Sequence, residues 1–382
     1  MSEASEHFEK IIAEQLARIE RMKSEGDFVD YGALDELVIG ICGGDGIGPS
    51  ITAQGERVLA HLLSDKVSEG KVRFLNIDGL TIENRAAAGK AIPDDVLAQL
   101  KSCHVILKGP TTTPKAGDPW PNIESANVAM RRELDLFANV RPVKVPSQGI
   151  DWVFFRENTE GSYVVGSKGL KYNDDLSIDF CVTTTQGTER IIELAYDYAI
   201  KTGRKRVDCV TKANIIKATD GKFLDKFNEI AEKHPDIAHD SWFVDIMSAK
   251  LIDEKRRRDF SVIVLPNLYG DILTDEAAEI QGGVGTAGSA NIGKRWAMFE
   301  AIHGSAPRMV EEGRAAYADP SSVLRACVLL LEHIGFGDRA EKLSAALDAV
   351  AAPDSPIKMT GRSGGSTGAE LADYVMSLVS KK

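Results

Sequence analysis

Residues 37–63 have the sequence LVIGICGGDGIGPSITAQGERVLAHLL. The stretch begins with LVIGIC, an unbroken apolar run that is typical of a strand buried on both faces of a parallel sheet. A glycine-rich turn follows, and Pro49 suits the first turn of a helix that we expect over residues 49–63. A strand, a tight turn and a helix in this order form the repeating unit of α/β proteins.

The same alternation continues along the chain. We expect further strands at residues 72–77, 104–107, 151–155, 179–185, 206–211 and 260–265. We expect further helices at residues 93–101, 188–201, 217–233, 271–281, 321–334, 338–351 and 367–379. The pattern predicts an α/β fold in which helices flank a largely parallel sheet.

An amphipathic helix precedes the first strand. Its apolar residues recur at spacings of three and four: Phe8, Ile11, Ile12, Leu16, Ile19 and Met22. Such a helix either packs on its own domain or contacts another subunit, and the first use is the commoner one.

The composition limits the class of protein. The chain has 382 residues with 43% apolar and 27% charged side chains, which is ordinary for a globular protein of two or three domains. Its formal net charge of −11 argues against a nucleic-acid-binding protein, which normally carries a basic surface. No apolar run approaches the ~20 residues that a membrane helix needs. Five widely spaced cysteines and the lack of a secretory signal favour free thiols and a cytoplasmic protein.

Two carboxylates follow one predicted strand. In PNLYGDILTDEAAEI (266–280), Asp271 and Asp275 are four residues apart, so they lie on one face of a helix near its N-terminus. Carboxylates at the carboxyl end of a strand can bind Mg²⁺ or Mn²⁺. They can also be solvated acids that interact with the helix dipole, and the pair by itself favours that second interpretation.

Several other polar residues lie near predicted strand ends. Arg156 directly follows an apolar run, and Arg131 and Arg141 precede it in the chain. Grouped arginines bind carboxylates through paired hydrogen bonds or form surface ion pairs with neighbouring acids, and the spacing leaves both interpretations open. Lys212 ends the strand RVDCVTK, where a lysine can act as a base, and Tyr163 is a candidate acid.

Neither glycine motif is a dinucleotide-binding fingerprint. GGDGIGP (43–49) joins a strand to a helix, where the backbone can wrap a ligand, but Pro49 replaces the third glycine and no P-loop lysine follows. Gly283, Gly285 and Gly288 match G-x-G-x-x-G, but they follow a helix rather than a strand. The sequence therefore does not support a Rossmann domain.

A series of motifs together resembles one family. The motifs are GGDGIGP, KGPTTTP (108–114), NVRP (139–142), RENTEG (156–161), TKANI (211–215), PNLYGDILTD (266–275), GSANIG (288–293) and HGSAP (303–307). In this order they resemble the metal-dependent β-decarboxylating dehydrogenases, the isocitrate and 3-isopropylmalate dehydrogenase family. The resemblance runs from about Leu37 to the C-terminus.

The resemblance implies a two-domain isocitrate/isopropylmalate dehydrogenase-like α/β fold with a large mixed or parallel sheet. Residues 37–136 and 282–382 would form a large domain, residues 137–281 a small central domain, and residues 1–36 a helical extension. The active site would lie in the cleft between the domains. A clasp at about residues 163–183 would join a homodimer with shared active sites, and the N-terminal helix could support a higher oligomer.

The resemblance also implies roles for individual residues. Substrate-binding positions are Ser125, Asn127, Arg131, Arg141 and Arg156. Metal-binding positions are Asp271 and Asp275, with Asp245 contributed by the neighbouring subunit. Tyr163 is the implied acid, and Lys212, also from the neighbouring subunit, is the implied base. Cofactor-binding positions are Thr113, Glu300, His303, Gly304, Ser305, Ala306, Arg308 and Asp319.

The implied activity is the Mg²⁺- or Mn²⁺-dependent oxidative decarboxylation of isocitrate to 2-oxoglutarate and CO₂ with NAD or NADP. Ser125 and Asn127 favour isocitrate, because isocitrate-specific members carry serine and asparagine at these spacings. A polar pocket discriminates against a branched alkyl substrate. Arg308-Met309 stands where NAD-dependent members usually carry an acidic residue, so we favour NADP over NAD.

Two alternatives stay open. The first is a related dehydrogenase acting on homoisocitrate or 3-isopropylmalate. The second is a non-catalytic regulatory subunit, which loss of the implied lysine, tyrosine or aspartates would indicate. This chain keeps all of these residues, and we expect a small-molecule tricarboxylate substrate and no nucleic-acid or membrane partner.

Overall fold

The computed structural model describes residues 3–115, 117–165 and 168–380, which belong to two compact units. Unit 1 consists of Met1–Asp27 and Leu136–Gln281, and unit 2 consists of Phe28–Asp135 and Gly282–Lys382. Chain segments far apart in sequence thus share each unit.

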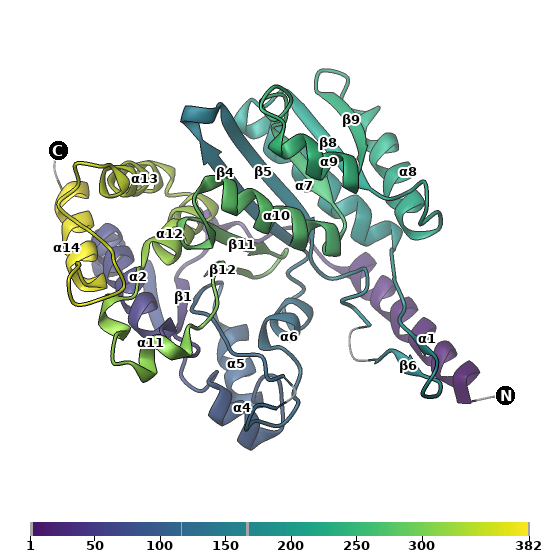
Figure 1. The fold of residues 1–382 in the computed structure, drawn as a ribbon, viewed down its shortest axis with the longest axis horizontal. Coiled ribbons are helices and arrows are strands. Elements are labelled where there is room, and N and C mark those ends of the chain that lie inside the picture. The colour runs from purple at the N-terminus through teal and green to yellow at the C-terminus, as the bar shows by residue number, and fades with distance from the viewer. Residues whose placement is uncertain (1–2, 116, 166–167, 381–382) are drawn as a thin grey trace. The chain divides into compact units, whose positions relative to one another are not determined.

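The elements of unit 1 are α1 (Glu3–Ser24), β4 (Ala138–Val145), η2 (Pro146–Gln148), β5 (Ile150–Glu157), β6 (Leu170–Lys171), β7 (Ser177–Ile178), α7 (Thr185–Thr202), β8 (Arg206–Thr211), α8 (Thr219–Ala231), β9 (Ala238–Phe243), α9 (Val244–Ile252), β10 (Val262–Leu265) and α10 (Asn267–Gln281) (Figure 1). The elements of unit 2 are η1 (Tyr31–Ala33), β1 (Leu37–Cys42), α2 (Gly48–Leu62), α3 (Ser64–Ser68), β2 (Val72–Asn76), α4 (Ile82–Ala88), α5 (Asp94–Ser102), β3 (Val105–Lys108), α6 (Ala126–Glu133), η4 (Val284–Thr286), β11 (Gly288–Ile292), β12 (Ala297–Ala301), α11 (Pro307–Glu311), η5 (Ala315–Tyr317), α12 (Ser321–His333), α13 (Gly337–Ala351) and α14 (Gly368–Val379).

The strands of unit 1 lie side by side in the order β4-β5-β10-β8-β9. β4 pairs antiparallel with β5, and the other neighbours are parallel. Successive side chains of a strand point to opposite faces of its sheet. Phe154 of β5 shares a core cluster with Leu273 of α10, whereas Phe155 lies against Tyr198 of α7 with ring centroids 5.3 Å apart. The helices α10 and α7 therefore cover opposite faces of β5.

The strands of unit 2 follow the order β2-β1-β3-β12-β11, and only the β11–β12 pair is antiparallel. Every residue of β1 is buried, as its unbroken apolar sequence predicts. A Cβ atom on Gly55 of α2 would lie 2.8 Å from a methyl carbon of Leu107. Gly55 thus lets α2 approach β3 closely. The predicted fold, a largely parallel sheet with flanking helices, is confirmed.

The carboxyl ends of the parallel strands carry the motifs singled out in the sequence. In unit 2, β1 leads into residues 43–49 and β3 into residues 109–114. In unit 1, β5, β8 and β10 end immediately before residues 158, 212 and 266. Ligands of open α/β sheets bind at such edges, so each unit presents its motifs where a site is expected.

The prediction of a strand at residues 179–185 is wrong. The described part of this region contains β6 and β7, which pair with each other, and one isolated bridge between Val182 and Gly161. Phe180, Val182 and the neighbouring threonines have a strand-like composition, but no further strand of the described residues lies beside them to complete a ladder. Residues 166–167 of the expected clasp lie outside the described residues.

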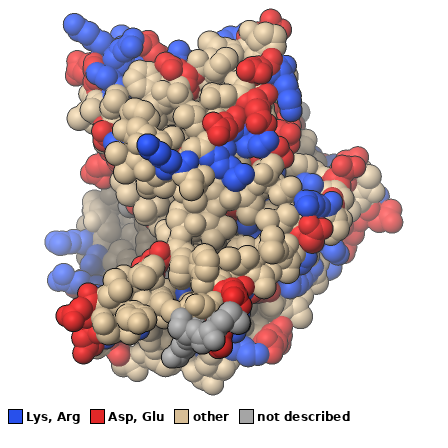
Figure 2. Space-filling model, turned by 90° about the vertical axis from the view of Figure 1, so that its right-hand side faces the viewer, with Lys and Arg blue, Asp and Glu red and all other residues tan. Residues whose placement is uncertain are grey.

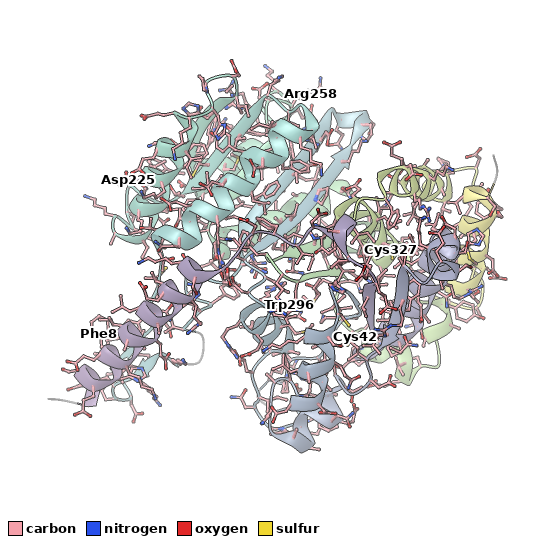
Figure 3. All side chains as sticks on the ribbon, turned by 180° about the vertical axis from the view of Figure 1, so that it is seen from behind. Phe8, Cys42, Asp225, Arg258, Trp296 and Cys327 are labelled. Atoms are coloured by element: carbon pink, nitrogen blue, oxygen red, sulfur yellow. The ribbon has the colours of Figure 1, made fainter. Side chains whose placement is uncertain are left out.

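Helix α1 buries one side only. Ile11 and Met22 are buried, whereas Phe8, Ile12 and Leu16 have 43–57% of their surface exposed. Phe8 can be located on this helix in Figure 3. The helix therefore packs on its own unit and also leaves an apolar stripe at the surface.

The cysteines are free thiols, as their wide spacing in the sequence predicts. Cys42 and Cys327 lie inside unit 2 (Figure 3), and Cys181 is exposed. On the face shown in Figure 2, basic and acidic side chains are interspersed and large areas carry neither. Among the described residues, no helix combines the length and apolar character that a bilayer crossing requires.

Candidate active site

Two arginines of unit 1 meet the carboxylate pair of α10. Arg156 Nη1 donates to Asp271 Oδ1 at 2.5 Å, and Arg141 Nη1 donates to Asp275 Oδ1 at 2.9 Å. The arginine side chains are 1% and 10% exposed, whereas those of Asp271 and Asp275 are 41% and 62% exposed. The strands thus bury the positive groups, and α10 presents the negative groups at the surface.

Local structure fixes the position of Arg156. Its Nε and Nη2 atoms donate to Asn267 Oδ1 at 3.1 and 2.8 Å. A Cβ atom on Gly270 would lie 2.3 Å from Arg156 Cγ, so only glycine leaves room for this side chain. Asn267 and Gly270 had no individual role in the sequence interpretation, although both lie in the motif PNLYGDILTD.

Tyr163 completes this cluster. Its hydroxyl donates to Asp271 Oδ2 at 2.6 Å, and the Arg156 guanidinium carbon lies 5.4 Å from the centre of its ring. Arg141, Arg156, Tyr163, Asp271 and Asp275 therefore form one group, which we call the α10 cluster.

Lys212 and Asp245 form a second pair of predicted site residues in unit 1. Lys212 follows β8, and its Nζ donates to Asp245 Oδ1 at the start of α9. This hydrogen bond lowers the pKa of Asp245. In the part of the chain that the structure describes, no three acidic, histidine or cysteine side chains lie close enough to hold a metal ion. One chain therefore does not bring Asp245 together with Asp271 and Asp275.

The α10 cluster contains donors that suit a divalent cation. Carboxylate oxygens are the ligands that Mg²⁺ and Mn²⁺ prefer, and both aspartates are accessible from solvent. Two carboxylates are too few to complete the coordination of such an ion. Substrate, water or a second chain would have to supply the other ligands.

Unit 2 holds a buried charge network around Glu300. Glu300 accepts hydrogen bonds from Lys108 Nζ at 3.0 Å and Asn291 Nδ2 at 2.9 Å, and Arg131 Nη2 lies 3.6 Å from its Oε1 atom. Burial would raise the pKa of Glu300, but Lys108, Arg131 and these hydrogen bonds lower it to about 2. Arg131 is thus paired with a residue that the resemblance assigns to the cofactor. Lys108 and Asn291 were missed, although both lie in quoted motifs.

A buried arginine stabilises the loop that leads to Ser125 and Asn127. The buried Arg85 donates to the carbonyl oxygens of Thr112 at 2.8 Å and Glu124 at 3.1 Å. Ser125 precedes α6 without capping it through its hydroxyl, and Asn127 Oδ1 accepts from Thr111 Oγ1 at 3.1 Å. Thr113 is exposed in the same loop.

The glycine loop at residues 43–49 contacts protein backbone. A Cβ atom on Gly46, which has a φ of +60°, would lie 2.0 Å from the carbonyl oxygen of Ser305. Asp45 accepts from the backbone N–H groups of Ile82 and Thr112, each at 2.7 Å. These glycines therefore serve the packing of residues 43–49 against residues 303–307, where Ala306 also has a left-handed φ of 44°.

The residues after HGSAP include both arginines and glutamates. Arg308 Nε donates to Glu312 Oε1 at 2.7 Å, and Arg314 Nε donates to Glu312 Oε2 at 2.8 Å. These hydrogen bonds, with a further contribution from Arg362, lower the pKa of Glu312. The exposed Glu312 carboxylate thus pairs with two guanidinium groups, those of Arg308 and Arg314.

The other predicted cofactor residues of this region have local partners. His303 Nδ1 lies 3.0 Å from the carbonyl oxygen of Gly304, and Asp319 accepts from the backbone N–H of Ser321 at 2.8 Å. His303 and Asp319 are both exposed or half-buried. Neither is held in a buried network.

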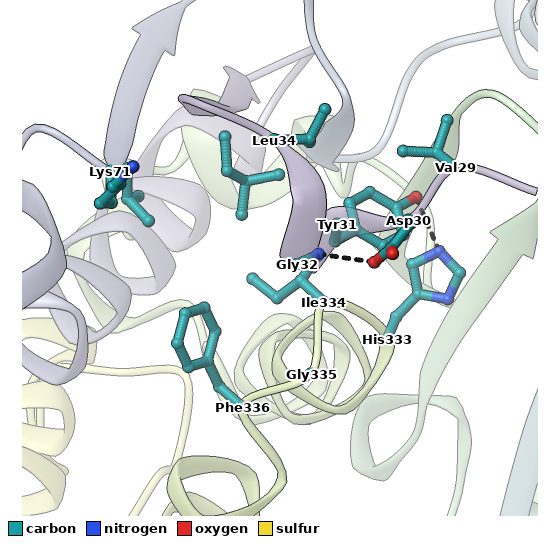
Figure 4. Close-up of a pocket in the computed structure, with 12 residues that line it drawn as sticks. Val29, Asp30, Tyr31, Gly32, Leu34, Lys71, His333, Ile334, Gly335 and Phe336 are labelled. Atoms are coloured by element: carbon teal, nitrogen blue, oxygen red, sulfur yellow. Dashed lines mark hydrogen bonds between the residues drawn. The ribbon is translucent and has the colours of Figure 1, made fainter.

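A pocket elsewhere in unit 2 contains none of the predicted site residues. It has a volume of about 590 Å³ and lies beside Tyr31 and His333, which share a 2.9 Å hydrogen bond (Figure 4). Leu37 and Val72, the first residues of β1 and β2, also line it. This pocket is therefore at the amino ends of these strands, opposite the edge where the motifs lie.

Comparison with known proteins agrees with this arrangement. The model of the isocitrate/isopropylmalate dehydrogenase family matches residues 38–366. The chain belongs to this family. It is thus a member of a family of decarboxylating dehydrogenases, and the resemblance drawn from the motifs is confirmed.

Relatives within the family carry several names. The chain is 39% identical over 309 residues to an NADP isocitrate dehydrogenase of Rickettsia prowazekii, a match covering 78% of this chain and 60% of that protein. It is 37% identical over 320 residues to a homoisocitrate dehydrogenase of Methanocaldococcus jannaschii, with 80% and 87% covered. The chain thus spans about 60% of the length of the rickettsial relative.

A solved family member shares the fold. The crystal structure of isocitrate dehydrogenase from Methylococcus capsulatus aligns with a TM-score of 0.76 and 34% identity, covering 90% of this chain and 99% of that one. The predicted isocitrate/isopropylmalate dehydrogenase-like fold is therefore confirmed.

Proposed function

We propose that this protein oxidatively decarboxylates isocitrate to 2-oxoglutarate and CO₂, with hydride transfer to a nicotinamide nucleotide. The α10 cluster is the observation that carries the proposal. Two nearly buried guanidinium groups, two exposed carboxylates and a tyrosine hydroxyl lie together there. This set offers positive charge for substrate carboxylates, oxygen ligands for a cation and a proton donor.

The chain's own groups divide the work as follows. Arg141 and Arg156, with Arg131 of α6, bind and orient substrate carboxylates through their guanidinium groups. Lys212 accepts the proton of the substrate hydroxyl, and Tyr163 gives a proton to C3 after CO₂ leaves. A divalent ion held by Asp271 and Asp275 would supply Lewis acidity toward the hydroxyl and the adjacent carboxylate.

Two subunits complete each site in this proposal. Lys212 and Asp245 pair with each other, and among the described residues of one chain Asp245 does not join Asp271 and Asp275 in a group that could hold a metal ion. A second copy that supplies its Lys212 and Asp245 would provide the missing base and the third carboxylate. The proposal therefore includes a homodimer with shared sites.

Isocitrate and NADP are the favoured ligands. Ser125 and Asn127 give the substrate loop polar side chains, which suits a third carboxylate better than a branched alkyl group. Arg308 stands directly after HGSAP, where NAD-dependent members usually carry an acidic residue, and a guanidinium group suits a 2′-phosphate. We therefore expect NADP to be the better hydride acceptor.

Initial rates at 340 nm test the proposal. Isocitrate, homoisocitrate and 3-isopropylmalate are each supplied with Mn²⁺ or Mg²⁺ and with NADP or NAD. We expect isocitrate with NADP to give the highest kcat/KM, by at least about tenfold over the other substrates. A higher value with homoisocitrate would favour the second candidate, which the Methanocaldococcus relative supports. No activity in any combination would indicate a non-catalytic subunit.

A further inference from the structure

Helix α1 lies along the segment that carries Tyr163. Arg18 contacts the start of this segment through Thr159 and Glu160. Toward the other end, Lys168 Nζ donates to Glu14 at 2.5 Å, and Phe8 lies against Phe180 with ring centroids 5.5 Å apart. The helix therefore contacts the segment on both sides of Tyr163.

The contact at Arg18 is buried and charged. Arg18 Nη1 donates to Glu160 Oε1 at 2.8 Å, and Nη2 donates to Thr159 Oγ1 at 2.9 Å. The side chains of Arg18 and Glu160 are only 12% and 3% exposed. A second buried acid, Glu157, accepts from the backbone N–H groups of Thr159 and Glu160 at 2.8 and 2.6 Å. Arg18 thus supplies positive charge to two buried carboxylates in a tight turn.

Glu160 connects this turn to the α10 cluster. Its side chain accepts from the backbone N–H of Thr184 at 2.9 Å, and its carbonyl oxygen accepts from Asn267 Nδ2 at 3.2 Å. Asn267 in turn accepts the two hydrogen bonds from Arg156 described above. Hydrogen bonds therefore run without a break from Arg18 through Glu160 and Asn267 to Arg156.

We propose that Arg18 is a positioning residue, which holds the turn at residues 157–161 so that Arg156 and Tyr163 keep their places in the α10 cluster. The inference rests on the proposed function, because it assigns α1 a part in that same site. Removing the guanidinium would leave the buried Glu160 with its Thr184 hydrogen bonds but without a cationic partner, and the turn would relax so that water reaches the carboxylate. Small displacements of groups that bind substrate cost catalytic efficiency steeply.

The test compares Arg18→Gln, Arg18→Lys and the control Arg21→Gln, which changes an exposed arginine of the same helix. We expect Arg18→Gln to lower kcat/KM for isocitrate about 10–100-fold, with Arg18→Lys in between because lysine lacks the two-pronged geometry. The kcat/KM of Arg21→Gln for isocitrate should stay within about twofold of the wild-type value. Amide hydrogen exchange without substrate should be faster at residues 157–165 in Arg18→Gln and unchanged in Arg21→Gln.

Each outcome bears on the proposal. Folded Arg18→Gln with kcat/KM within about twofold of wild type, or with unchanged exchange at residues 157–165, would overturn it. If Arg18→Gln does not fold, Arg18→Lys decides by the same two measurements. Amide hydrogen exchange can be measured without turnover. If the wild-type protein is inactive on isocitrate, the proposed function is wrong, and the exchange result still decides whether Arg18 holds the turn at residues 157–161.

Discussion

At the scale of single residues, substituting Lys212 should affect the catalytic step, measured by kcat, and leave substrate binding largely unchanged. Its partner Asp245 is 61% exposed, so losing this ion pair costs little stability. We expect Lys212→Met to lower kcat with isocitrate about 10²–10⁴-fold, because the proton acceptor is gone. KM should change little, since the arginines still bind the carboxylates. Steady-state kinetics against Lys222→Met, an exposed lysine of α8, measures both constants, and near-normal turnover would remove Lys212 from this role.

Glu157 predicts a pH dependence of stability. Burial and the neighbouring Glu160 raise its pKa from 4.5 to about 7, and Arg18 opposes this shift. The folded state therefore holds an extra proton between these values, so the free energy of unfolding falls as the pH rises through this window. Arg190 also faces the turn, through a 3.1 Å hydrogen bond to Thr159 Oγ1.

Removing Arg18 should extend to higher pH the range over which the free energy of unfolding falls. Without its guanidinium the pKa of Glu157 rises further, so the buried site loses stability over a wider pH range. We expect the Tm deficit of Arg18→Gln relative to wild type to be larger at about pH 8 than at about pH 5, by roughly 2 °C or more. Thermal melts across this range measure it. A deficit that is constant or shrinks with rising pH would contradict the assignment.

At the scale of elements, α10 depends on the missing side chain of Gly270. Alanine usually stabilises a helix by about 1 kcal/mol relative to glycine, but here its Cβ would overlap Arg156 Cγ. We expect Gly270→Ala to lower the free energy of unfolding by about 1–3 kcal/mol and to impair isocitrate binding. Gly221→Ala in α8 is the matched control, because nothing lies within 4 Å of its Cβ position. Urea titrations that show both substitutions stabilising would contradict the close contact.

Elements were predictable from sequence where one strand or helix carries its own signal. The apolar run of β1 and the strand and helix on either side of Pro266 were found, although α10 begins at Asn267 rather than near Gly270. β9 was missed because most of its residues are exposed, so no apolar alternation marks it. β4 was missed because Pro142 and Lys144 interrupt its pattern.

The site was predictable only where motifs name residue types. Asp271, Asp275 and Arg156 lie in quoted motifs, and Tyr163 follows the motif RENTEG by two residues. The motifs also contain Asn267 and Glu160, but the pairings of these residues were not predictable, because the partners are distant in sequence: Arg156 and Asn267 are 111 residues apart, and Arg18 and Glu160 are 142 apart. A local pattern carries no information about such pairs, which only the folded chain brings together.

At the scale of the whole molecule, shared sites can be tested by mixing two inactive variants. Tyr163→Phe removes the proposed acid, and Lys212→Met removes the proposed base. If Lys212 serves the site of the neighbouring subunit, a dimer with one copy of each variant has one site with both defects and one site with neither. Random pairing makes about half of the dimers mixed, so about a quarter of the wild-type kcat should return.

The expected recovery depends on exchange between subunits. Co-expressing the two variants with different tags and purifying the doubly tagged dimers removes this variable, and these dimers should then show about half of the wild-type kcat. Dimers of Lys212→Met with a Lys212→Met, Tyr163→Phe double variant form the control and should stay inactive. If the sites were complete within each chain, every subunit of the mixed dimer would carry one defect, and mixing would restore nothing. Within the described residues of one chain, Asp245 does not complete a three-carboxylate group with Asp271 and Asp275, which is the reason to expect recovery.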